Sequence, residues 1–281
     1  MNKLIKEEKV RVVACLVEGN SLRSTVRITG IHRTTIQNLL VDLGTACSNY
    51  QDKTFHNLNC NRIECDEIWS LVYSKANNVP AHLRGVFGIG DVWTWTALCP
   101  DTKLVPCWMV GPRDAATAYH FMHDLKARLA KWVQLTTDGL KAYWEAPESA
   151  FGSEIDFAQL VKIYGTEVGP KANTPERKYS PAQCVGARKT VISGNPDFKH
   201  VSTSHTERQN LTMRMSIRRF TRLTNAFSKK LENHEAAIAL HFMWYNFGRI
   251  HQTLRCTPAM EAGVSDHVWT IEEIVGLLEK A

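Results

Sequence analysis

The stretch at residues 62–73, which reads R-I-E-C-D-E-I-W-S-L-V-Y, is the most informative about the fold. Its β-branched and aromatic residues predict a buried β-strand. Asp66 lies inside this strand among apolar neighbours. A carboxylate in an apolar strand is costly unless something compensates its charge, and hard oxygen ligands suit Mg²⁺. We therefore expect Asp66 to hold a divalent cation.

Two glutamates share the strand with Asp66. Because side chains alternate along a strand, we expect Glu67 to point to the opposite side of the sheet from Asp66. Glu64 should share the side of Asp66 near the start of the strand, either as a supporting group or simply solvated.

The sequence around this strand predicts an α/β core. Residues 85–99 and 103–110 predict two more strands, the first followed by the turn P-D-T-K. Residues 114–130 predict an amphipathic helix, residues 133–139 a fourth strand, and residues 141–151 a short helix. Residues 165–198 are rich in proline and polar side chains, which predicts an irregular insertion around one more strand, R-K-T-V-I-S. Alternation of strands and helices is typical of an α/β fold.

Two further acids stand out by position. Asp138 ends the fourth strand in T-T-D-G, and Glu207 begins a predicted helix in S-H-T-E-R-Q-N-L-T-M-R. Alone, Asp138 could belong to an ordinary turn, and Glu207 could stabilise a first helical turn as an anion. Together with Asp66 they form a more specific candidate metal site.

Glu207 opens a stretch of seven basic residues with no other acid before Glu232. Such local clustering points to a polyanion partner. Arg214, Arg218 and Arg222 are expected on one helix face. The basic residues are Arg208, Arg214, Arg218, Arg219, Arg222, Lys229 and Lys230.

The N-terminal region predicts three short helices, at residues 3–19, 21–30 and 33–44, with the turn T-G-I-H before the last. This is the outline of a helix-turn-helix; the alternative is a small helical cap. In the first reading the third helix enters the major groove. The side chains that it would present to DNA are Arg33, Thr34, Thr35, Gln37 and Asn38.

Composition narrows the class of protein. The chain has 281 residues and a formal charge of +6, enough for a large core and a small accessory domain. Its eight cysteines form no C-x-x-C pair, so we expect reduced thiols in a cytoplasmic protein. The charged first residues exclude a secretory signal there, and no apolar run is long enough to span a membrane.

Three segments resemble the acidic motifs of DDE transposases, most closely those of the insertion-sequence-one type. They are C-D-E-I-W-S-L-V-Y-S-K, T-T-D-G-L-K-A-Y and H-T-E-R-Q-N-L-T-M-R. The resemblance covers about residues 62–255 and implies an RNase H-like core, a mixed sheet flanked by helices. It also implies that Asp66, Asp138 and Glu207 bind two Mg²⁺ or Mn²⁺ ions. Arg214, seven residues after the glutamate, matches a basic position of the family.

The resemblance implies a transposase that binds the terminal inverted repeats of an insertion sequence and joins them to target DNA by two-metal-ion transesterification. We expect a homodimer or higher assembly on double-stranded DNA, associated with the nucleoid. His205 could assist proton transfer or contact DNA, although a capping or surface role is the simpler expectation. Asn210 could steady a ligand or a phosphate.

Two alternatives remain open from the sequence: a DNA-binding repressor without catalysis, and a nuclease of RNase H type. Three acids beside DNA phosphates disfavour the repressor, and a sequence-reading helix disfavours the nuclease. The predicted organisation is a helix-turn-helix domain at 1–47, a linker at 48–61, a catalytic domain at 62–255 with an insertion at 165–198, and a helical tail at 256–281.

Overall fold

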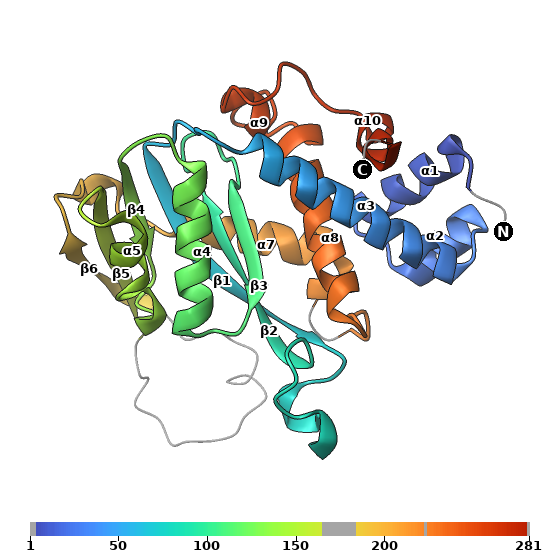
Figure 1. Cartoon of the computed structure of the whole chain (residues 1–281), viewed down its shortest axis with the longest axis horizontal. Helices are drawn as coiled ribbons and strands as arrows, with labels where there is room; N and C mark the ends of the chain where they lie inside the picture. Colours follow the sequence, from blue (N-terminus) through green and yellow to red (C-terminus); the bar gives the residue numbers. More distant parts are fainter. Residues whose placement is uncertain (1–3, 165–183, 222–223, 280–281) are drawn as a thin grey trace.

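The computed structural model describes residues 4–164, 184–221 and 224–279 (Figure 1). These ranges form a mixed α/β structure with one six-stranded sheet in the order β3-β2-β1-β4-β5-β6. Every helix within them is too short or too polar to cross a membrane. The strands are β1 Arg62–Val72, β2 Gly90–Leu98, β3 Cys107–Gly111, β4 Val133–Thr137, β5 Ile155–Tyr164 and β6 Cys184–Ser193.

The sheet is antiparallel at its ends and parallel in its middle. β1, β4 and β5 run parallel, while β2 and β3 on one side and β6 on the other are antiparallel to their neighbours. The predicted strands are present, and the strand expected near R-K-T-V-I-S extends over the whole of β6. The sequence pattern did not predict β5, which pairs parallel with β4 and antiparallel with β6.

Helices cover both faces of the sheet. Figure 1 shows α4 on one face and α7 on the other. Alternation along β1 divides its side chains between them: Cys65 joins the core under α4, and Ile68 joins a second core with Met213 of α7. The helices are α1 Lys6–Val17, α2 Leu22–Thr29, α3 Arg33–Thr54, α4 Ala115–Arg128, α5 Ala146–Phe151, α7 Ser204–Ser216, α8 Leu231–Met243, α9 Pro258–Glu261 and α10 Ile271–Gly276, with a π-helical turn at Trp244–Gly248.

The three predicted N-terminal helices are present. Ser21 caps α2 by accepting a 3.0 Å hydrogen bond from the Ser24 amide, and Gly30 ends it with a φ of 74°. The third helix is longer than expected, since α3 continues to Thr54. Residues 48–54, expected to be linker, are therefore helical; Tyr50 packs on the core against Phe247, and Gln51 is buried.

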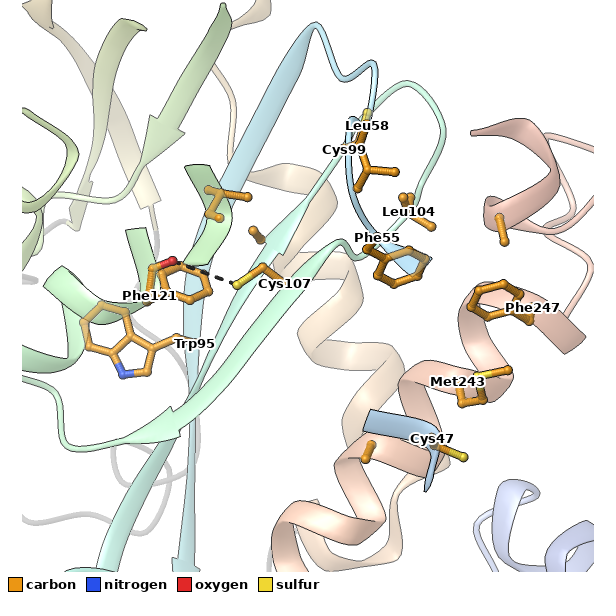
Figure 2. Close-up of a cluster of buried hydrophobic side chains, with 14 of the residues drawn as sticks. Cys47, Phe55, Leu58, Trp95, Cys99, Leu104, Cys107, Phe121, Met243 and Phe247 are labelled. Atoms are coloured by element: carbon orange, nitrogen blue, oxygen red, sulfur yellow. Dashed lines mark hydrogen bonds between the residues drawn. The ribbon is translucent and has the colours of Figure 1, made fainter. Parts of the chain in front are cut away.

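Contact between α3 and α8 is close. A Cβ atom on Gly44 would lie 2.5 Å from the Ala236 Cα atom, so only glycine permits the two backbones to approach this far. Farther along, Phe55 stacks on Phe247 with ring centroids 5.7 Å apart, as Figure 2 shows. Helices from the two ends of the chain thus share one hydrophobic core with the sheet.

The basic helix is shorter than the sequence predicted. α7 ends at Ser216, and Ile217 is extended because its buried side chain packs into the core beside α8. Arg218 lies in the following 3₁₀ turn, so the expectation that it continues the helix face of Arg214 is wrong. Arg222 and most of the predicted insertion, 165–183, lie outside the described residues.

Candidate functional site

Three acidic side chains meet where β1 runs past the end of β4. Glu64 of β1 pairs in register with Thr136 of β4, so two residues further on Asp66 lies beside Asp138. Carboxylate oxygens of Asp66, Glu67 and Asp138 all lie within 4.8 Å of one another. We call these three residues the acidic cluster. Its hard oxygen donors could hold a metal ion.

Glu67 corrects one expectation from the sequence. Its backbone position does place it on the other face of β1, yet its carboxylate reaches the cluster, because β4 ends at Thr137 and leaves that side of β1 open. The Glu67 side chain is fully buried and accepts hydrogen bonds from the Tyr143 hydroxyl and from Arg113. It is therefore a fixed member of the cluster rather than a group facing away.

Arg113 is a positively charged side chain that pairs with the acidic cluster. The sequence pattern did not predict it as a site residue. Its Nε donates to Glu67 Oε2 at 3.0 Å and its Nη2 to Asp138 Oδ2 at 3.3 Å. The guanidinium lies 4.7 Å from the centroid of the Trp93 ring. One guanidinium thus bridges two of the three acids.

Burial raises the carboxyl pKa values in the cluster. The pKa of Asp66 rises to about 7, first because the group is buried and then because Asp138 and Glu207 repel its charge. The pKa of Glu67 also rises to about 7, mainly through burial, with a further contribution from Asp138. Both carboxyls are therefore only partly ionised near neutral pH, and a bound cation would favour their ionised forms.

Glu207 lies in the first turn of α7, near the cluster but outside the group of three. It accepts a 2.7 Å hydrogen bond from the Thr203 hydroxyl and is ion-paired with Lys162 of β5. One turn later, Asn210 donates from Nδ2 to Asp66 Oδ2 at 2.8 Å. The structure therefore brings Asp66 and Asp138 together, with Glu207 close enough to act on the Asp66 charge.

Glu64 holds the start of α7 against the sheet. Its buried carboxylate accepts hydrogen bonds from the backbone amides of His205 and Thr206 at 2.8 and 3.3 Å. The His205 ring bonds the other Glu64 oxygen at 2.8 Å. An anion at a helix N-terminus satisfies amides that have no partner within the helix. Glu64 is thus not solvated, and with His205 it fixes the direction in which α7 presents Glu207.

The residues expected to contact DNA fall into two regions. At the start of α3, Arg33, Thr34 and Asn38 are exposed, whereas Thr35 and Gln37 are half-buried. The apolar residues of the same helix segment, Ile36, Leu39, Leu40 and Leu43, are all buried.

The second region lies along and after α7. Arg208 and Arg218 are exposed and Arg214 is half-buried. Arg219 turns inward instead, where its Nη1 donates to Ser228 Oγ at 2.8 Å and burial lowers its pKa to about 10. Arg219 is therefore poorly placed for the DNA contact that the sequence suggested.

Comparison with known proteins adds no family assignment. Neither a scan against protein-family models nor a search of curated proteins finds a match to this chain.

Proposed function

We propose that this protein is a DNA transposase of the DDE type that uses Asp66, Asp138 and Glu207 to bind the metal ions of phosphoryl transfer. The observation that carries the proposal is the meeting of Asp66, in β1, and Asp138, just after the end of β4, in one acidic cluster. Glu207 supports it from α7, since its charge contributes to the raised pKa of Asp66.

The arrangement of the sheet supports an RNase H-like core. The strands β3, β2 and β1 are antiparallel to one another, and β4 pairs in parallel with the other edge of β1. Helices cover both faces of the sheet. The acids that the resemblance to DDE transposases implies then fall in the middle of β1, just after β4, and on a late helix. A sheet compatible with that fold and the positions of these acids point to the same function.

Two Mg²⁺ ions bound by these carboxylates would supply activation of an attacking hydroxyl and stabilisation of a leaving 3′-oxygen. The chain itself sets the geometry. Asn210 orients Asp66, and Glu64 fixes the start of α7 and hence the place of Glu207. Exposed Arg208 and Arg218 would hold the DNA backbone beside the site. Arg33, Thr34 and Asn38 at the start of α3 would read the terminal repeats as part of a helix-turn-helix.

A cleavage and joining assay tests this function. The substrate is duplex DNA carrying the repeats that flank the gene, with Mg²⁺ or Mn²⁺ as the metal. We expect metal-dependent joining by the wild type and at least a hundredfold loss in Asp138→Asn, because electrostatic stabilisation supplies most of such rate enhancements. Asp101→Asn is a matched control, since Asp101 and Asp138 are 34% and 35% exposed and each pairs with an arginine.

The outcomes separate the candidate functions. Specific binding of the repeats without cleavage under either metal would favour a repressor and contradict the proposal. Metal-dependent hydrolysis without joining would favour a nuclease of RNase H type. Equal activity in Asp138→Asn and the wild type would exclude the acidic cluster from the chemistry.

A further inference from the structure

Arg113 occupies a rigid position between β3 and α4. The carbonyl of Pro112, just before it, accepts a 3.1 Å hydrogen bond from the Trp95 indole, and Asp114, just after it, caps α4 through the Thr117 amide at 2.9 Å. Trp93 supports the guanidinium from one side. The backbone on both sides is thus tied down, and the guanidinium is held where it meets the acidic cluster.

The two bonds of Arg113 go to acids that a metal ion would also use. Glu67 Oε2 and Asp138 Oδ2 each accept one of them, and both residues belong to the group whose oxygens lie close enough to share a cation. A guanidinium at this position supplies the charge that the cluster would otherwise take from a metal. The Arg113 side chain is 36% exposed, so part of it faces solvent and the guanidinium can move in that direction.

We propose that Arg113 is the counter-ion of the acidic cluster when no metal is bound. A metal ion replaces the Arg113 guanidinium in the cluster, and the phosphate of bound DNA draws this guanidinium away. This inference rests on the proposed function. It makes Arg113 a positioning residue whose guanidinium changes partners between carboxylates and a phosphate, both of which fit its planar fork.

Coupling between metal and DNA follows from this exchange. In the free protein Arg113 competes with the metal, so metal affinity is weak. Phosphate binding by Arg113 removes the competitor and raises metal affinity. By thermodynamic reciprocity, metal in the cluster raises DNA affinity by the same factor.

The test is Mn²⁺ binding to the full-length protein, measured by electron paramagnetic resonance of the free ion, with and without a DNA duplex. Without DNA, we expect Arg113→Gln to bind Mn²⁺ about tenfold more tightly than the wild type, since about 1.4 kcal/mol of competition corresponds to that factor. Arg113→Lys, which keeps the charge, should stay within about threefold of the wild type. DNA should tighten Mn²⁺ binding more in the wild type than in Arg113→Gln.

Arg62→Gln is the matched control, because Arg62 also pairs with one aspartate and its side chain is 27% exposed. Its Mn²⁺ affinity should equal that of the wild type. Equal or weaker Mn²⁺ binding by Arg113→Gln without DNA overturns the counter-ion role while leaving the transposase proposal intact. Absence of Mn²⁺ binding by the wild type, with or without DNA, overturns both.

Discussion

At the scale of single residues, Asp66 controls the electrostatics of the site. Its carboxyl is enclosed by β1, α7 and the neighbouring acids, and its pKa of about 7 lies well above the usual 3.8. In the absence of metal the fold therefore favours the neutral acid. The stability that this group contributes is fully present below pH ~4 and is lost as the pH rises through about 7.

Asp66→Asn should consequently stabilise the metal-free protein at pH 8. The amide cannot ionise, so we expect the gain in the free energy of unfolding to be larger at pH 8 than at pH 5, by on the order of 2 kcal/mol. Urea denaturation in EDTA at the two pH values measures this. Asp101→Asn serves as the control, and a loss of stability in Asp66→Asn that is equal at both pH values would contradict the electrostatic account.

Individual site residues differed in how far the sequence could predict them. Asp66 was predictable because an acid inside an apolar strand needs a partner. Arg113 was not, because its partners, Glu67 and Asp138, are 46 and 25 residues away in the chain and are joined to it only by the sheet. Glu67 was misplaced because alternation fixes the direction of a Cβ atom and not the reach of a long side chain.

At the scale of elements, the crossing of α3 and α8 depends on Gly44. Gly44→Val should destabilise the protein by about 3 kcal/mol or more, since the added side chain meets the Ala236 backbone, which cannot move aside cheaply. Chemical denaturation measures the loss. Gly276→Ala in α10 is the control, because a Cβ atom there meets nothing within 4 Å, and it should be neutral or stabilising. Equal effects of the two substitutions would show that α3 and α8 do not pack this closely.

Helices and strands in which apolar residues recur with a clear period were predicted well. The residues at which these elements end were predicted less well. The amphipathic helix predicted at residues 114–130 is present as α4, and its apolar residues Phe121 and Leu125 are fully buried. The end of α7 was missed because the polar and basic pattern continues past Ser216, whereas Ile217 leaves the helix to fill a core formed with residues of α8. Such tertiary packing overrides local helix propensity.

At the scale of the whole molecule, Asn246 joins parts of the chain that lie far apart in sequence. It is fully buried in the π-helical turn, accepts a 3.0 Å hydrogen bond from the Val105 amide, and donates to the Val105 carbonyl at 3.0 Å and to Gln51 of α3 at 3.3 Å. The helix α3, the connection between β2 and β3, and the π-helical turn after α8 are thus joined through one amide.

Asn246→Ala should cost about 2–4 kcal/mol, because it leaves the buried Val105 backbone groups without partners. We expect differential scanning calorimetry to show one transition in the wild type and the same single transition, at lower temperature, in the variant. A separate transition for the N-terminal helices in the wild type would contradict the shared core.

We propose above that the acidic cluster holds the metal ions of DNA phosphoryl transfer. The most direct measurement is anomalous diffraction from crystals of the full-length protein with Mn²⁺ and a duplex ending in its terminal repeat. We expect a Mn²⁺ peak about 2.1 Å from oxygens of Asp66 and Asp138, with Arg113 turned toward a DNA phosphate. A bound duplex with no Mn²⁺ at the cluster, and Arg113 still between Glu67 and Asp138, would contradict it.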